Sequence, residues 1–92
     1  MSLGPQSRIV VSPSVYSRAF GEELVLLDFA RGEYFGLDPI GAATFKELEA
    51  GAPVSRAIEA IVAAYDVSPD VAERDILSLV QQMQEQGLLT VV

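Results

Sequence analysis

The sequence contains no cysteine, no histidine and no tryptophan. Without cysteine there is no disulfide framework, no thiolate nucleophile and no cysteine-ligated metal site. Without histidine the commonest general base and metal ligand is missing as well. No stretch approaches the roughly 18 consecutive apolar residues of a membrane span, and no basic segment followed by an apolar core marks a secretory signal. We therefore expect no catalytic residues, no metal, no cofactor and no membrane partner, and we take the cytoplasm as the default location.

Positive charge is also scarce, with 6 basic residues against 13 acidic ones and a net charge of −7 over 92 residues. Residues 1–31 are neutral, since three arginines balance three acids, so the whole excess lies in residues 32–92. A nucleic-acid-binding protein normally carries the opposite sign, so no nucleic-acid partner is expected. Half of the residues are apolar. That content and this length indicate one small folded domain with a single core.

Three short runs with strand composition follow one another at 15–20, 23–29 and 33–37. Turn signals separate them, with Gly21 and Gly32 available for positive φ. The second run is apolar on both faces, which predicts that it lies in the centre of the sheet. The sequence therefore predicts a three-stranded antiparallel meander.

Helix signals dominate the rest of the chain. Asp38 is followed by proline, which is typical of a helix start, and Gly51 marks the end of this first helix. Ser55 is the expected N-cap of a second helix, whose apolar stripe continues to Tyr65. Ser68 is the expected N-cap of a third helix that ends at Gly87. The predicted fold class is α+β and winged helix-turn-helix-like, with three antiparallel strands followed by three helices.

The predicted third helix occupies the position that reads DNA in a winged helix, but its charges oppose that use. It carries four acids, Asp70, Glu73, Asp75 and Glu85, against Arg74. The domain organisation we expect is an extended lead-in over residues 1–11, with an expression-tag remnant at 1–3, and one domain over 12–92. The apolar tail 88–92 would suit an additional strand.

Several segments, taken in order and spacing, resemble the PqqD-like family, also called RiPP recognition elements. They are Glu23-Leu24-Val25-Leu26-Leu27-Asp28, Gly32-Glu33-Tyr34-Phe35-Gly36-Leu37-Asp38, Gly41-Ala42, Asp66-Val67, Ala72, Asp75-Ile76 and Gly87-Leu88-Leu89. Where the founding members, which act in pyrroloquinoline quinone biosynthesis, tend to have a Tyr-Pro-Glu-Gly turn, this chain has Phe29-Ala30-Arg31-Gly32. The match is closer to the broader peptide-chaperone branch, which includes the recognition proteins of lasso-peptide pathways.

The resemblance implies a function as well as a fold. In this family the leader segment of a ribosomally made precursor peptide adds as an antiparallel strand beside the third strand and lies against the third helix. The implied partners are that leader peptide and a separate modifying enzyme, which would be a radical enzyme, a protease or a cyclase. The implied peptide-binding residues are Glu33, Tyr34, Phe35, Gly36, Leu37, Asp75, Ile76, Leu79, Val80 and Met83.

Each of these residues also has a purely structural interpretation. Tyr34 and Phe35 suit ordinary sheet packing, and the apolar residues of the third helix form a core stripe. Asp75 has the position of a solvated helix charge, and Arg31 that of a solvated loop residue. The alternative function from another class is a structural or regulatory dimerisation module, a homodimer that uses the same open sheet edge.

Overall fold

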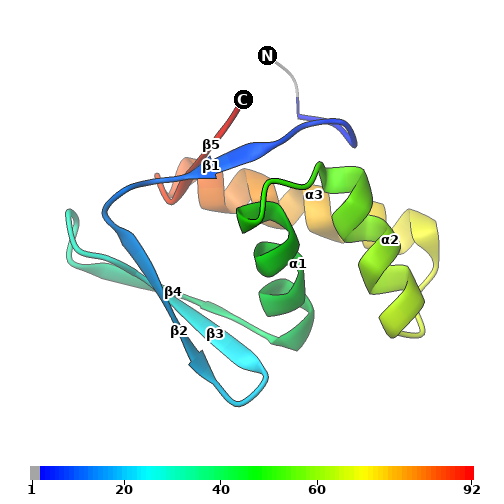
Figure 1. The fold of residues 1–92 in the computed structure, drawn as a ribbon, viewed down its shortest axis with the longest axis horizontal. Coiled ribbons are helices and arrows are strands. Elements are labelled where there is room, and N and C mark those ends of the chain that lie inside the picture. The colour runs from blue at the N-terminus through cyan, green and yellow to red at the C-terminus, as the bar shows by residue number, and fades with distance from the viewer. Residues whose placement is uncertain (1–2) are drawn as a thin grey trace.

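The computed structural model describes residues 3–92 and contains two small sheets and three helices (Figure 1). The elements in chain order are β1 (Ile9–Val11), β2 (Val15–Phe20), β3 (Glu23–Asp28), β4 (Glu33–Leu37), α1 (Pro39–Glu49), α2 (Val54–Ala64), α3 (Pro69–Glu85) and β5 (Leu89–Val91). Helix α1 lies between the sheet of β2, β3 and β4 and the other two helices (Figure 1). The predicted α+β arrangement of three antiparallel strands followed by three helices is confirmed.

Strand β3 lies in the centre of the three-stranded sheet, as its two apolar faces predicted, with the order β2-β3-β4. It ends at Asp28 rather than at Phe29. The reason is the buried Asp28 carboxylate, whose Oδ1 accepts hydrogen bonds from Ser14 Oγ at 2.9 Å and from the Ala30 N–H at 3.1 Å. These bonds turn the chain away from the sheet directly after Asp28.

A second sheet joins the two ends of the chain. Strand β1 pairs antiparallel with β5, with Ile9 opposite Val91 and Val11 opposite Leu89. Ile9 and Leu89 are both buried. Residues 9–11 of the expected lead-in therefore form a strand, and the apolar tail supplies its partner. Of the expected tag remnant at 1–3, residues 1–2 lie outside the described residues.

At two of the three predicted helix starts the predicted residue forms a side-chain N-cap. Asp38 Oδ1 accepts a hydrogen bond from the Gly41 N–H at 2.8 Å, and Ser68 Oγ accepts one from the Val71 N–H at 3.4 Å. The end of α3 is also as predicted. Gly87 has φ +76°, which glycine adopts without steric cost. The chain reversal there lets the Leu88 N–H donate to the Met83 carbonyl at 2.9 Å.

The prediction that Ser55 caps α2 is wrong, because the helix begins at Val54 and its N-cap position is Pro53, two residues earlier. Carbonyl groups of the N-terminal segment take the place of a side-chain cap. The Val54 N–H donates to the Ser7 carbonyl at 2.9 Å, and the Ser55 N–H donates to the Pro5 carbonyl at 2.6 Å. The first turn of α2 is thus satisfied by a tertiary contact.

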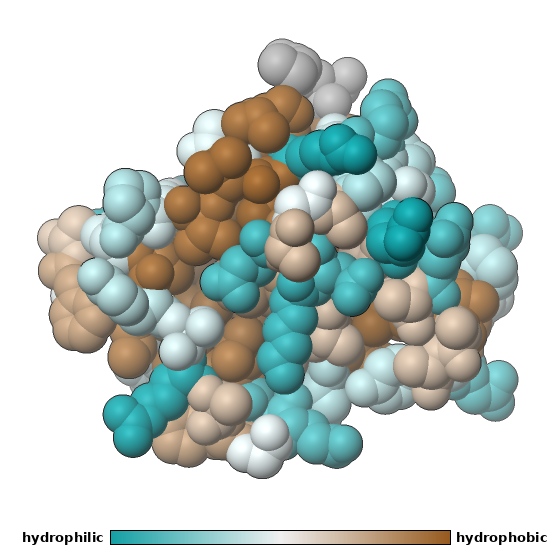
Figure 2. Space-filling view, in the orientation of Figure 1, coloured by the Kyte–Doolittle hydropathy of each residue, from teal (hydrophilic) through white to brown (hydrophobic). Residues whose placement is uncertain are grey.

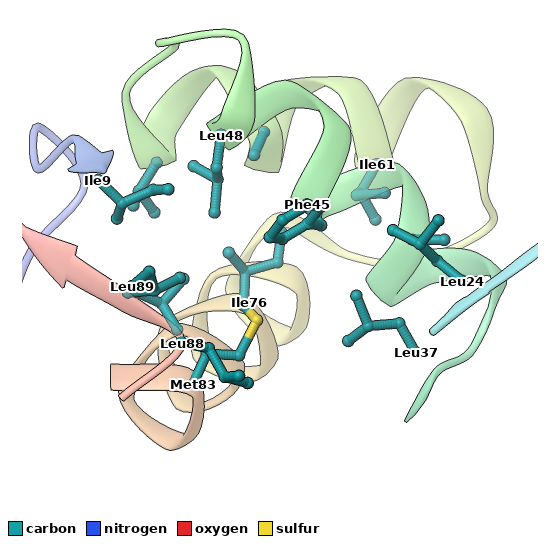
Figure 3. Packing of buried hydrophobic residues seen from close by; sticks show 14 of the residues in the cluster. Ile9, Leu24, Leu37, Phe45, Leu48, Ile61, Ile76, Met83, Leu88 and Leu89 are labelled. Atoms are coloured by element: carbon teal, nitrogen blue, oxygen red, sulfur yellow. The ribbon is translucent and has the colours of Figure 1, made fainter. Parts of the chain in front are cut away.

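All three helices and both sheets contribute to one hydrophobic core. Phe45 of α1 lies in the middle of the cluster, with Ile76 of α3 directed toward it (Figure 3). Leu24 and Leu37 bring the three-stranded sheet into this core, and all four side chains are buried. The core therefore anchors the inner face of the three-stranded sheet against α1. Strands β2 and β4 form the two edges of this sheet.

Candidate functional site

Strand β4 is hydrogen-bonded to β3 on one side, and its other side is a free edge of the sheet. The orientation of its backbone groups follows from two observed bonds. The Phe29 N–H donates to Ser14 on the β2 side, and the Gly32 N–H donates to the Asp28 carbonyl on the β4 side. Antiparallel strands alternate these directions residue by residue. The even-numbered residues of β3 therefore bond to their partners in β4.

These partners in β4 are Glu33, Phe35 and Leu37. The intervening residues, Tyr34 and Gly36, point their backbone N–H and C=O groups away from β3. Each residue has one donor and one acceptor, so two donors and two acceptors line the free edge. Gly36 has no side chain, and a Cβ built at this position would meet nothing within 4 Å. A second extended backbone can therefore approach this edge closely.

The side chains of β4 divide between the two faces of the sheet. Leu37 is buried and Phe35 is half-buried on the inner face, toward the helices. Tyr34 projects from the outer face and keeps 78% of its surface exposed. The free edge thus has an apolar side that faces the helices and an open side that faces solvent.

A groove of about 510 Å³ lies between this edge, the first turns of α1 and the middle of α3. It is lined by Phe35, Gly36, Leu37, Asp38, Ile40, Gly41, Thr44, Asp75, Ile76, Ser78, Leu79 and Gln82. The β4 side of the groove is apolar, whereas α3 contributes a mixture of apolar and polar side chains. This combination suits a peptide backbone that pairs with β4 and alternates apolar with polar side chains.

The structure brings together six of the ten residues that the sequence indicated, namely Phe35, Gly36, Leu37, Asp75, Ile76 and Leu79. Glu33 and Tyr34 line a smaller hollow of about 280 Å³ near the end of α3, with Gly32 and Gln86.

Val80 and Met83 do not line the groove, because both are completely buried in the core. They share α3 with the groove residues but lie on the face that packs against the rest of the protein. The implied peptide-binding role of these two residues therefore has no exposed surface in the groove, and both belong to the core stripe.

The sequence reasoning missed the contribution of α1 and two polar residues of α3. Ser78 and Gln82 lie three and seven positions after Asp75, a spacing that places them on the same helix face. That spacing could have identified them. Gly41 also lines the groove. A Cβ at this position would lie 3.3 Å from both Asp38 Oδ1 and a methyl group of Leu37. A larger residue would disturb the start of α1.

Charge in the groove is negative on its α3 wall. The Asp75 carboxylate lies 3.5 Å from Arg74 Nε, and both side chains are largely exposed, so this ion pair is weak. Asp75 remains able to attract a basic group in the groove.

Among residues 3–92 no cluster of three or more acidic side chains has the geometry of a metal site. No helix of this segment is long and apolar enough to cross a membrane.

The outer face of the sheet carries exposed aromatic side chains. Tyr16 and Phe29 meet edge to face, with ring centroids 5.3 Å apart at 70°, and both are more than half exposed. Tyr34 lies across the sheet from Tyr16, since both are paired with Leu27. Another apolar area lies over β1 (Figure 2). None of the residues that line the groove beside β4 comes from β1.

The family comparison agrees with this geometry. The family model of coenzyme PQQ synthesis protein D (PqqD) matches residues 23–89, which include β3, β4 and all three helices. The chain belongs to the PqqD family. No curated protein sequence matches this PqqD-family chain.

Two solved structures are similar to this PqqD-family protein over most of its length. The first is TbiB1 in complex with the TbiA(beta) leader peptide, with a TM-score of 0.81, 34% identity, and coverage of 86% of this chain and 92% of the other. The second is lasso peptide synthetase B1 complexed with the leader peptide, also with a TM-score of 0.81, at 28% identity and with 92% and 98% coverage. Both structures were determined with a leader peptide bound.

Proposed function

We propose that this protein is a non-catalytic module that binds the leader segment of a ribosomally made precursor peptide by strand addition beside β4. The observation that carries the proposal is the free edge of β4, where the backbone groups of Tyr34 and Gly36 point away from β3 and the groove lined by β4 and α3 lies beside the strand. The two similar structures support it, because both are leader-peptide complexes.

In this arrangement the peptide runs antiparallel to β4, and its C-terminal part lies near Glu33. Alternate peptide side chains enter the groove between the inner face of β4 and α3. Phe35 and Leu37 contribute from the strand, and Ile76 and Leu79 contribute from the helix. Main-chain hydrogen bonds supply affinity without sequence preference, and the side chains in the groove select the peptide.

Asp75 adds a preference for charge. Its carboxylate lines the groove and is largely exposed, so it would attract a lysine or arginine of the leader without a large desolvation cost. Because this attraction acts between solvated groups, salt would screen it. We therefore propose that the groove favours leaders with a basic residue opposite α3.

The partner that acts on the peptide is a separate modifying enzyme, and the outer face of the sheet offers it a surface. Exposed aromatic side chains grouped on one face are typical of protein–protein contacts. A peptide strand added beside β4 would extend the same sheet, so an enzyme docked over Tyr16, Phe29 and Tyr34 would contact both the protein and its peptide. Because precursor peptides are made on ribosomes, this assembly would act in the cytoplasm.

The direct test is an NMR titration of the labelled protein with the leader of a precursor peptide encoded beside its gene. We expect the largest shift changes at the amides of Tyr34 and Gly36 and at the groove residues of α3. Shift changes confined to the β2 edge, or none at saturating peptide, would refute the proposal. Mass measurement of the free protein tests the dimerisation alternative, in which a second copy already occupies the edge.

A further inference from the structure

The turn between β3 and β4 is attached to the C-terminal end of α3 by one side chain. Arg31 Nη1 donates a hydrogen bond to the Gln86 carbonyl at 2.5 Å, and Gln86 is the C-cap residue of α3. Arg31 Nε lies 3.5 Å from Glu33 Oε1, at the first residue of β4. Arg31 is about half exposed, as a solvated loop residue would be, but its guanidinium also bridges two elements that are far apart in the sequence.

The chemistry of the helix end favours this contact. The last carbonyl groups of a helix carry partial negative charge and lack partners within the helix. The last turn of α3 contains no basic residue of its own, so Arg31 supplies the complementary charge from the sheet. Glycine at position 87 leaves the necessary space, since a Cβ there would lie 3.2 Å from Arg31 Nη1.

The position of this bond matters for the groove. Within residues 3–92 it is the sole hydrogen bond that we find between the segment β2–β4 and the segment 69–87. The sheet and α3 lie on opposite sides of the groove, and Arg31 connects them at the Glu33 end of β4. The smaller hollow formed by Gly32, Glu33, Tyr34 and Gln86 lies beside this bridge.

We infer that Arg31 is a positioning residue, which holds the Glu33 end of β4 at a fixed spacing from α3 so that the groove is formed before a peptide arrives. The inference deepens the proposed function and rests on it for the identity of the ligand. A preformed groove binds more tightly because less conformational freedom is lost on binding. The effect should be confined to the C-terminal part of an antiparallel peptide, which lies near Glu33.

The first experiment needs no peptide. Backbone ¹⁵N order parameters are measured for the wild type, for Arg31→Gln, and for the control Arg56→Gln, which removes another exposed arginine with a carboxylate neighbour, Glu59, on α2. In the wild type and the control we expect values near the rigid limit of about 0.85 for Gly32 and Glu33, and in Arg31→Gln a fall toward about 0.6. Arg31→Lys keeps the charge and a donor, so it should restore most of the order.

The second experiment uses the TbiA(beta) leader peptide as a probe in calorimetric titrations. We expect Arg31→Gln to raise its Kd about tenfold, which corresponds to about 1.4 kcal/mol, and Arg56→Gln to leave it unchanged. A probe shortened at its C-terminal end should bind the wild type and Arg31→Gln equally.

The outcomes separate this inference from the proposed function. Unchanged order parameters in Arg31→Gln overturn the positioning role, as does an equal loss of affinity for the long and short probes. A lower melting temperature with unchanged order would indicate a helix-capping role alone, and would likewise overturn it. If the probe does not bind the wild type, the assigned ligand class is in question, and the order parameters still decide the role of Arg31.

Discussion

Replacement of Gly36 by proline tests the docking edge most directly. The N–H of Gly36 points away from β3, so proline at this position removes no hydrogen bond from the sheet. Edge strands accept proline where the N–H faces solvent, and the extended backbone of Phe35 is compatible with a following proline. Because a Cβ at position 36 would meet nothing within 4 Å, we expect the variant to fold.

The expected loss of affinity follows from the groups at the edge. Proline removes one of the two outward donors of β4 and leaves a peptide carbonyl without a partner. An unpaired polar group of this kind costs about 1–3 kcal/mol, or about 5- to 150-fold in Kd. The ring also occupies the space that the peptide backbone needs, so the upper part of this range is expected.

The assay is a calorimetric titration of the leader peptide, with circular dichroism and thermal melting to confirm the fold. Gly36→Ala is the first control, since it keeps the N–H and should change the Kd by less than about threefold. Ser17→Pro is the matched control on the opposite edge. Ser17 lies between Tyr16 and Arg18 on β2, so alternation directs its N–H away from β3.

We expect Ser17→Pro to leave the affinity unchanged. A folded Gly36→Pro variant that binds as tightly as the wild type would refute the reasoning. The reverse pattern, in which Ser17→Pro alone abolishes binding, would move the docking edge to β2.

Four further predictions concern the groove, its charge, the start of α1 and the outer face. Leu79→Ala should raise the Kd of the peptide about tenfold in calorimetry, and because Leu79 is only half-buried against the core, it should cost less stability than truncation of Met83. Met83→Ala should instead lower the free energy of unfolding by about 2–5 kcal/mol in urea titrations. If both variants raised the peptide Kd equally, the assignment of Leu79 to the groove and of Met83 to the core would be contradicted. Asp75→Asn should weaken binding of a leader with a basic residue at low salt and reduce the dependence of Kd on salt concentration; an affinity of the wild type that salt does not change would contradict the charge preference. Asp38→Ala should lower the free energy of unfolding by about 0.5–2 kcal/mol through loss of the helix cap, measured by denaturant unfolding. Tyr16→Ser should leave peptide affinity unchanged but weaken capture of the modifying enzyme in a pull-down, and a loss of peptide binding would show that the outer face is not a separate surface.

Local features of the sequence were sufficient for most of the fold. Strand composition and the turn signals at Gly21 and Gly32 identified the three strands, and apolar residues on both faces placed β3 in the centre. Asp38, Ser68 and Gly87 act through neighbours in the chain, so their roles at helix ends could be read without knowledge of the tertiary structure. The same local reasoning gave a wrong N-cap at Ser55, because the carbonyl groups that accept hydrogen bonds from the first N–H groups of α2 belong to residues 5 and 7.

What the sequence by itself determined is the type and order of the elements, since these depend on interactions between residues close in the chain. The tertiary structure decided which side chains of α3 face the groove and which face the core, a distinction that separates Leu79 from Met83 although both are apolar. It also decided the role of Arg31, whose partner lies 55 positions away. Contacts of this kind leave no periodic signal in the sequence, because they depend on how the sheet and helices pack around the common core.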